Sequence, residues 1–200
     1  METRDIFVEC EVGLALDQVV RDIQEIVPPD IFNMKDFYFA GGCIYCLWNN
    51  KPVKDYDIFC RNKAALKKLK LHFKKNRHLV NYWSNNAITV GKYQFVILHV
   101  GAPEDEVAKF DFKHNCYYYD GKSIHSIFGW EHITTNQLIF NDERARDLFT
   151  IIGRIPKFLE RGMTISQMDV LNILEVCTRL PRVFRERASL LAARRGKGRY

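Results

Sequence analysis

The stretch that most constrains the fold of this chain is residues 37–60, FYFAGGCIYCLWNNKPVKDYDIFC. The apolar run Phe37–Ala40 predicts a short buried strand, and the helical apolar spacing of Cys43–Trp48 predicts a helix. Gly41 and Gly42 stand between them. They allow a tight turn that a Cβ would obstruct, and they let backbone N–H groups approach a phosphate closely. The stretch therefore predicts a strand, a phosphate-accessible turn and a helix in direct succession.

Two carboxylates stand at the start of the next predicted strand, after the polar turn Asn49–Lys54. In an extended segment Asp55 and Asp57 point to one face, and Tyr56 and Ile58 point to the other. Adjacent carboxylates repel one another, so a divalent cation is their natural partner, and hard oxygen ligands suit Mg²⁺. An isolated Asp-x-Asp is more often a solvated strand end. A phosphate-accessible turn beside a metal-binding Asp-x-Asp, however, supplies the parts that phosphoryl transfer requires.

Gly41-Gly42, twelve further residues and then Asp55-Tyr56-Asp57 resemble the signature of the polymerase-β-like nucleotidyltransferase superfamily. The likeness is strongest to the head domain of tRNA CCA-adding enzymes and bacterial poly(A) polymerases. It implies an α+β nucleotidyltransferase fold, in which a small mixed β-sheet is flanked by helices and carries a C-terminal helical appendage. It also implies a nucleotidyltransferase that moves NMP from an NTP substrate to a hydroxyl acceptor, with Mg²⁺ or Mn²⁺ as cofactor.

A third carboxylate is expected on an extended segment at Lys109–Asn115. Asp111 lies between two phenylalanines, so we expect its side chain to point away from a buried face, where it would complete a two-metal site. Residues 93–121 resemble the corresponding region of small viral and phage nucleotidyltransferase-like proteins and, more loosely, the RRDFTINAL-type motif of CCA-adding enzymes. The second likeness implies that Asp111 and Asn115 contact the nucleotide ribose. Metal ligand, ribose contact and turn-capping residue stay open for Asp111.

The chain departs from the CCA-adding pattern in three places. Tyr45-Cys46 stand where the family has an Arg-Asp pair, and Lys109-Phe110 replace a double arginine. The element that selects the incoming base in CCA-adding enzymes is not evident. These differences argue against specific CCA synthesis. They favour a smaller transferase that uses Lys51, Lys54 or Lys92 on the triphosphate.

The predicted site combines the residues named so far. The predicted catalytic and metal-binding residues are Asp55, Asp57 and Asp111, and the predicted nucleotide-binding residues are Gly41, Gly42, Lys54 and Asn115. The rival hypothesis is a catalytically inactive nucleotidyltransferase-fold protein that acts as a nucleic-acid-binding or scaffolding module. The missing Arg-Asp pair favours this rival, and the retention of all three carboxylates argues against it.

The net charge of +6 is consistent with a nucleic-acid partner. Basic side chains crowd residues 63–77 and the last twenty residues, so we expect an RNA acceptor such as a tRNA-like 3′ end. A protein hydroxyl acceptor stays open. No apolar run approaches the ~20 residues of a membrane span, and no secretory signal is visible at the N-terminus, so a cytoplasmic protein without a membrane partner is expected. The C-x-x-C pair Cys43 and Cys46 is interpreted as packed thiols, because nothing else completes a zinc site.

The expected domain organisation is a head-like nucleotidyltransferase domain at 1–138, a helical neck-like segment at 139–183 and a basic mobile tail at 184–200. Phe140–Arg146 resembles the stretch that joins head to neck in the CCA-adding family. An amphipathic helix is expected at 14–27.

Further elements follow from local signals. A helix capped by Asn62 is expected to end near Lys75, strands with tight turns are expected within 79–100, and a short helix at 103–107. Pro156 is expected to end or kink a later helix. Thr164 or Ser166 is expected to cap the last one.

Overall fold

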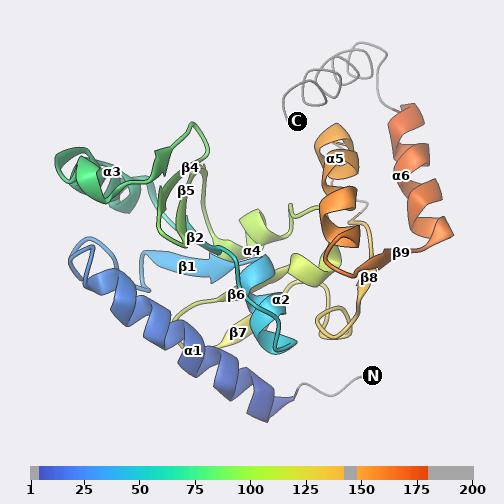
Figure 1. Ribbon diagram of the computed structural model, residues 1–200, viewed down its shortest axis with the longest axis horizontal. Helices are drawn as coiled ribbons and strands as arrows, with labels where there is room; N and C mark the ends of the chain where they lie inside the picture. The colour runs from blue at the N-terminus through green and yellow to red at the C-terminus, as the bar shows by residue number, and fades with distance from the viewer. Residues whose placement is uncertain (1–4, 142–147, 180–200) are drawn as a thin grey trace. The chain divides into compact units, whose positions relative to one another are not determined.

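The computed structural model describes residues 5–141 and 148–179 (Figure 1). Within these ranges the chain forms two compact units, one of residues 5–110 with 114–134 and one of residues 111–113 with 135–141 and 148–179. The predicted basic tail at 184–200 lies outside the described residues. So do Asp142 and Arg146, on which the resemblance to the head-to-neck junction depends.

The first unit is built on a seven-stranded sheet with the order β3-β4-β5-β2-β1-β6-β7. Its strands are β1 (Phe37–Ala40), β2 (Tyr56–Cys60), β3 (Tyr82–Trp83), β4 (Ala87–Val90), β5 (Tyr93–Val100), β6 (Tyr117–Tyr119) and β7 (Ile124–Ser126). β2 and β5 are parallel, and the other neighbouring pairs are antiparallel. The sheet is therefore mixed, and the strands predicted at 37–40 and within 79–100 are confirmed.

Helices lie on both faces of this sheet (Figure 1). They are α1 (Ile6–Gln24), α2 (Gly42–Trp48), α3 (Lys63–Lys75) and α4 (Pro103–Val107), with 3₁₀ turns η1 (Arg77–Leu79) and η2 (Lys113–Asn115). The larger core joins Leu16 of α1 and Phe73 of α3 to Phe39 of β1. A smaller core on the opposite face joins Tyr38 of β1 to Val107 of α4.

Capping residues set the starts of two helices. The Asn62 side chain accepts a hydrogen bond from the Ala65 N–H at 2.8 Å, so the predicted cap of α3 is confirmed. The helix predicted at 14–27 is longer at its N-terminus, because the Asp5 side chain accepts from the Phe7 and Val8 N–H groups and starts α1 eight residues earlier. This correction reflects a cap that the apolar periodicity alone does not reveal.

The second unit contains β8 (Gln137–Leu138) and β9 (Thr164–Ile165), which pair in parallel, and the helices α5 (Leu148–Leu159) and α6 (Gln167–Arg179). Pro156 was expected to end or kink its helix. It does not end the helix, because α5 continues past it to Leu159. Proline removes one hydrogen bond, and the helical ladder resumes with the Glu160 N–H donating to the Pro156 carbonyl at 2.9 Å. Ser166 caps α6 by accepting from the Asp169 N–H at 3.0 Å.

Among the helices described here, none combines the length and the apolar character that a membrane crossing would demand.

Candidate active site

The pairing of β1 with β2 places the two predicted motifs side by side. Phe37 pairs with Cys60 and Phe39 pairs with Ile58 in antiparallel register. Because the strands run in opposite directions, the end of β1 lies beside the start of β2. The Gly41 turn follows the first strand, and Asp57 is the second residue of the other. The sheet therefore brings the glycine turn and the Asp-x-Asp motif together, where β1 ends and β2 begins.

Gly41 is required by both conformation and space. Its φ of +84° lies in a region of backbone conformation that residues with a Cβ rarely adopt. A Cβ built on Gly41 would lie 3.3 Å from Cε2 of Phe110 and 3.9 Å from Oδ2 of Asp57. The turn thus passes directly over the Asp57 carboxylate, and Phe110 forms its other wall. The resemblance places Phe110 where CCA-adding enzymes have an arginine, but the sequence gives no signal for its contact with the glycine turn.

The Asp-x-Asp strand has the predicted alternation. Tyr56 and Ile58 are buried, whereas Asp55 and Asp57 are each partly exposed. Within the described ranges, no three His, Cys, Asp or Glu side chains are grouped for one metal ion. Two carboxylates are still a fitting donor set, because Mg²⁺ commonly takes one or two carboxylates and completes its coordination with substrate phosphates and water.

Asn115 lies beside the second glycine. A Cβ on Gly42 would lie 3.8 Å from Oδ1 of Asn115. Because glycine lacks a Cβ, the space beside this oxygen atom is not filled by a side chain of residue 42. The Asn115 Oδ1 atom is buried and accepts no hydrogen bond within the part of the chain that the structure describes. A buried acceptor without a donor is costly unless a ligand or water supplies one. The position of Asn115 therefore fits contact with a hydroxyl group of a ligand at the glycine turn.

The candidate triphosphate-binding lysines differ in their surroundings. Lys51 donates from Nζ to the Tyr45 hydroxyl at 3.2 Å and lies 4.9 Å from the centroid of that ring. Lys54 is exposed in the loop immediately before Asp55. Lys92 lies over the rings of Tyr56 and Tyr93 instead. Tyr45, which the resemblance places where CCA-adding enzymes have an arginine, therefore orients a lysine from the following loop.

Burial keeps two further groups near this site uncharged. It lowers the pKa of His114 to about 3, with the Lys51 and His132 charges acting in the same direction, and the His114 ring lies edge-on to Tyr45 at 4.9 Å. Burial, reinforced by the charge of Asp57, raises the pKa of the Cys43 thiol. Cys43 Sγ donates to the Ala40 carbonyl at 3.6 Å. Cys43 is thus a neutral packed thiol at neutral pH, in agreement with the interpretation of the C-x-x-C pair.

The expectation that Asp111 stands on a strand with its side chain directed away from a buried face is wrong. Asp111 lies in a non-strand segment of the second unit, is itself only 5% exposed, and forms an ion pair with Arg154 of α5. Phe112 beside it forms an isolated bridge with Phe140 and packs against Phe158. Local pairing within the second unit therefore replaces the predicted strand, and a direct metal or ribose role for Asp111 stays a prediction.

Solved enzymes share this fold. The Bacillus stearothermophilus CCA-adding enzyme in complex with CTP superposes with a TM-score of 0.57 at 19% identity, covering 86% of this chain and 44% of that one. Another CCA-adding enzyme with CTP gives 0.54 at 14% identity, over 86% and 45% of the two chains. A tRNA-processing enzyme in apo form I gives 0.52 at 14% identity, over 91% and 51%. The chain thus spans about half the length of these enzymes and has the nucleotidyltransferase fold, which confirms the expected fold class.

The family model described as Gabija anti-defense 2 family protein matches residues 14–143. That range is well over half of the 200 residues, so this chain belongs to the Gabija anti-defense 2 family. A curated relative, Gabija anti-defense 2 of Bacillus phage SPbetaL7, is 24% identical over 152 residues, which are 69% of this chain and 36% of the relative. The chain spans about a third of that relative's length. The expected likeness to phage proteins is confirmed at this level.

Proposed function

We propose that this protein is a metal-dependent nucleotidyltransferase that moves NMP from an NTP to a hydroxyl acceptor. The observation that carries the proposal is that Gly41 lies close to the Asp57 carboxylate and Gly42 lies close to the Asn115 side chain. Both glycines belong to the turn that follows β1. In the reaction, the acceptor oxygen bonds to the α-phosphorus, the bond from that phosphorus to the β-bridging oxygen breaks, pyrophosphate leaves and the hydroxyl proton passes to solvent.

Asp55 and Asp57 would hold Mg²⁺ or Mn²⁺. When bound there, a divalent cation offsets the phosphate charge and lowers the pKa of a nearby hydroxyl. The open backbone at Gly41 and Gly42 allows a phosphate to approach more closely than a turn with side chains would permit. Side-chain cations would neutralise the phosphates that approach this turn.

Lys51 and Lys54 are the proposed cations for the triphosphate. Tyr45 restrains Lys51 through a hydrogen bond and its ring, so little side-chain entropy remains to be lost when Lys51 binds phosphate. Lys54, which is exposed, supplies a mobile second charge. Asn115 would accept a hydrogen bond from a ribose hydroxyl, and this contact satisfies its buried Oδ1 atom.

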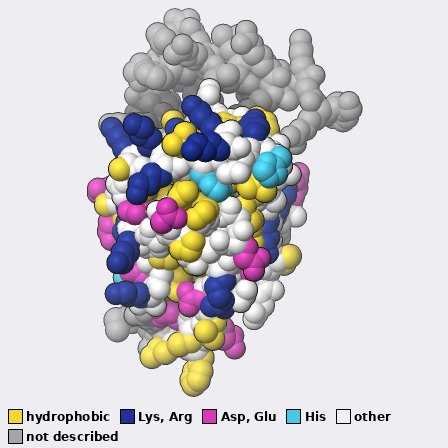
Figure 2. All heavy atoms as spheres, turned by 90° about the vertical axis from the view of Figure 1, so that its left-hand side faces the viewer, with side chains coloured by type: hydrophobic (Ala, Val, Ile, Leu, Met, Phe, Trp, Pro, Cys, Tyr) yellow, Lys and Arg dark blue, Asp and Glu magenta, His cyan; other side chains and the backbone are white. Residues whose placement is uncertain are grey.

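The surface of α3 supports RNA as the acceptor. Lys63, Lys67, Lys70 and Lys74 recur at intervals of four, three and four residues, so they lie on one side of the helix, and α3 contains no acidic residue. With Leu66 and Leu71 they line a hollow of about 310 Å³. Figure 2, which faces the side that carries α3 in Figure 1, shows many Lys and Arg side chains.

That arrangement destabilises the free helix. Like charges at i,i+4 repel, and Lys63 at the first helical position opposes the helix dipole. A glutamate or aspartate at i,i+3 or i,i+4 would relieve such repulsion, and α3 contains neither. A phosphate backbone along α3 would remove the repulsion and release counterions.

The family name suggests the biological setting. A Gabija anti-defense protein of a phage would counteract a host defence, so we infer that nucleotide transfer inactivates a component of that defence. The CCA-adding enzyme that was solved with CTP supports an NTP donor. The neighbour that is named as a tRNA-processing enzyme supports an RNA acceptor. A hydroxyl on a host defence protein is the alternative acceptor, and it requires the same catalytic residues.

The test is a transfer assay with each α-labelled NTP, Mg²⁺ or Mn²⁺, and an extract that contains both RNA and protein of a host. The matched control is Asp55→Asn/Asp57→Asn, which changes charge with almost no change in volume. Label that enters RNA with wild type alone supports the proposal in full, and label on a protein supports transfer while correcting the acceptor. Absence of transfer by wild type with all four nucleotides and both metals contradicts it.

A catalytically inactive module is the second candidate function, favoured by Tyr45 and Cys46 in place of the Arg-Asp pair of CCA-adding enzymes. Such a module binds RNA through α3 but has no metal-dependent affinity for NTP. Calorimetric titration of a nonhydrolysable NTP with and without Mg²⁺ separates the two functions, because only the enzyme gains affinity when the metal is present.

A further inference from the structure

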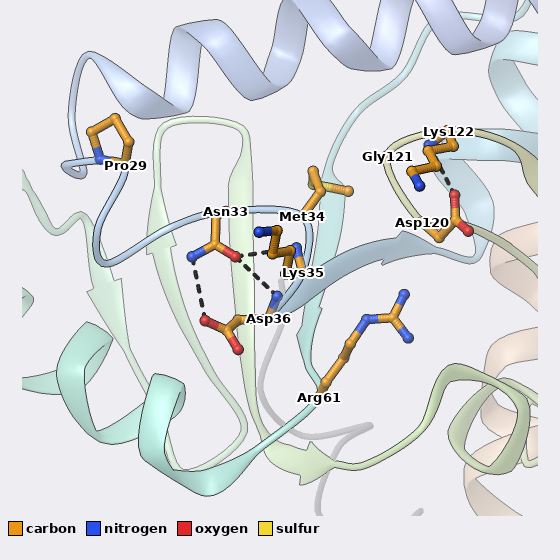
Figure 3. Close-up of a pocket in the computed structure, with 9 residues that line it drawn as sticks. All are labelled: Pro29, Asn33, Met34, Lys35, Asp36, Arg61, Asp120, Gly121 and Lys122. Carbon is orange, nitrogen blue, oxygen red and sulfur yellow. Dashed lines mark hydrogen bonds between the residues drawn. The ribbon is translucent and has the colours of Figure 1, made fainter.

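A second hollow, of about 800 Å³, opens on the first unit (Figure 3). We call it the Arg61 pocket. Its walls are the connector 29–36, Arg61 and the turn 120–122. Because β1 runs antiparallel to β2 and β6, the residues before β1 lie beside the residues that follow β2 and β6, at one end of these strands. The glycine turn follows β1 and therefore lies at the opposite end of the strands.

Three cationic side chains line the Arg61 pocket: Lys35, Arg61 and Lys122. Among the described residues, none of the three forms an ion pair with a carboxylate. Arg61 is held in place, because its guanidinium lies 5.3 Å from the centroid of the buried Tyr38 ring and its backbone N–H donates to the Asp36 carbonyl at 2.8 Å. In Figure 3 its side chain extends toward the turn 120–122.

The pocket also contains the carboxylate of Asp36, but neutral groups bind it. Asn62 donates from Nδ2 to Oδ1 of Asp36 at 2.8 Å, and Asn33 donates from Nδ2 to Oδ2 at 3.3 Å. These amides satisfy the carboxylate without adding a positive charge. The Asp36 carboxylate is therefore already hydrogen-bonded and does not form an ion pair with the pocket's cations.

Asp120 is occupied in a similar way. It accepts hydrogen bonds from the backbone N–H groups of Lys122 at 2.8 Å and Ser123 at 2.9 Å, and its Oδ2 lies 3.0 Å from Nε2 of His125. Burial raises the pKa of Asp120, but these hydrogen bonds outweigh burial and hold the pKa below its ordinary value. Both carboxylates thus have partners of their own, and the three cations remain available to an anion.

The shape of the pocket fits a small molecule with both charged and apolar parts. Gly121 has a φ of +96°, and a Cβ there would lie 2.5 Å from Cβ of Met34, so the turn fits closely against that side chain. Met34 and Pro29 add apolar surface beside the cations. A volume of this size is in the range of small-molecule sites, which combine apolar walls with a few polar groups.

We propose that the Arg61 pocket binds the phosphate groups of a nucleotide-sized ligand, at a site separate from that of the transferred nucleotide. Arg61 presents a guanidinium that matches phosphate oxygens in pairs, and Lys35 and Lys122 add two point charges. The apolar surface of Met34 and Pro29 contacts the remainder of the ligand. Because the pocket uses none of the candidate catalytic residues, this site does not depend on transfer activity.

The test measures binding in the Asp55→Asn/Asp57→Asn chain with EDTA present, so that metal-dependent binding at the candidate active site does not contribute. The probes, titrated by calorimetry at low salt, are ATP, inorganic pyrophosphate and a short oligoribonucleotide. Adding Lys35→Gln/Lys122→Gln is expected to weaken binding roughly tenfold or more, because two charge-assisted contacts are lost. Neither lysine side chain has a hydrogen-bond partner in the described structure, so this variant should fold normally.

Lys68→Gln/Lys75→Gln is the matched control, because it removes the same charge from exposed positions on α3. Its affinity for ATP and pyrophosphate should stay within about twofold of the parent chain, as expected for distant surface charges. Arg61→Gln is a second variant and should weaken binding further. Pocket-dependent binding of ATP or pyrophosphate identifies a small phosphorylated ligand, and pocket-dependent binding of the oligoribonucleotide alone identifies a polynucleotide as the source of the phosphate. Equal affinities of the pocket and control variants, or no binding of any probe at millimolar concentration, overturn the proposal.

Discussion

The Oδ2 atom of Asp57 lies 3.9 Å from the point that a Cβ on Gly41 would occupy. This closeness joins a residue after β1 to a residue of β2 across sixteen positions of sequence. It makes the glycine turn and the Asp-x-Asp parts of one surface, so a change at either should affect the same function.

The Gly41→Ala variant tests the requirement for an open backbone. The new Cβ would meet Phe110 at 3.3 Å and hold a positive φ, so we expect a loss of about 1–2 kcal/mol of stability. Nucleotide transfer should fall more than this loss explains, because the methyl group narrows the approach to Asp57. Chemical denaturation and the transfer assay measure the two effects. Gly153→Ala is the control, because a Cβ there meets nothing within 4 Å.

The two carboxylates should be individually essential. Asp57→Asn and Asp55→Asn are each expected to lower the transfer rate by roughly 10²–10³-fold, because metal coordination contributes several kcal/mol to the transition state. Stability should remain within about 1 kcal/mol of wild type, since both side chains are partly exposed. Single-turnover kinetics with thermal melting measures both. A transfer rate within a few-fold of wild type in either variant would contradict the proposed metal site.

The α3 lysines should govern RNA affinity and its salt dependence. Lys67→Gln/Lys70→Gln/Lys74→Gln removes three charges from one side of the helix, and the slope of log K against log salt should become less steep by roughly 2, at about 0.7 per single-strand phosphate. Affinity should also fall at low salt. Fluorescence anisotropy with a labelled oligoribonucleotide measures both quantities.

Lys68→Gln/Lys75→Gln is again the control, because these lysines lie on a different side of α3. It should change the slope less per charge removed. If the three-lysine and two-lysine variants differ only in proportion to the number of charges removed, the net charge of the protein explains the binding, and no defined surface is needed.

The ion pair of Asp111 with Arg154 should contribute to the stability of the second unit. Arg154→Gln leaves a carboxylate that is 5% exposed without this counter-charge. The guanidinium is half exposed, so solvent screening reduces the expected loss to about 1–3 kcal/mol. Denaturant unfolding of Arg154→Gln, Asp111→Asn and the double variant measures the coupling energy. If the two losses simply add, the pair contributes nothing of its own.

The same three variants bear on the role of Asp111 in transfer. A purely structural Asp111 predicts equal transfer rates for Asp111→Asn and Arg154→Gln at a temperature where both are folded. A direct metal or ribose role predicts that only Asp111→Asn loses activity. The rates therefore distinguish the alternatives that the sequence leaves open.

Buried His114 should make the protein sensitive to acid. Its pKa is about 3 in the folded chain and about 6.5 when unfolded, so the unfolded state binds a proton first as the pH falls. Stability attributable to His114 is therefore complete above pH 6.5 and is lost progressively down to about pH 3, by up to roughly 1.4 kcal/mol per pH unit. Denaturation between pH 7 and pH 4.5 should show a shallower decline for His114→Gln than for wild type. Parallel declines would contradict this assignment.

Local sequence signals were sufficient for the elements that depend on near neighbours. The apolar run Phe37–Ala40, the Asn62 cap and the alternation around Asp55 and Asp57 each became the structure that they predict. The motif Gly41-Gly42 with Asp-x-Asp likewise pointed to the fold that the solved neighbours confirm. The strand, the cap and the alternation each involve residues within a few positions of one another, so local patterns record them directly, whereas the motif pointed to the fold through a family resemblance.

Other features were settled by tertiary contacts alone. Asp111 was expected on an exposed strand face, but its buried carboxylate forms an ion pair with the half-exposed Arg154, forty-three residues later. Phe110 became a wall of the glycine turn, and Tyr45 became the support for Lys51, and both residues depart from the motif of the CCA-adding enzymes. The sequence by itself thus determined the central strands, the Asn62-capped helix and the motif whose resemblance pointed to the fold. Only the tertiary structure decided which side chains meet, because each such contact forms between segments whose separation along the chain carries no local signal.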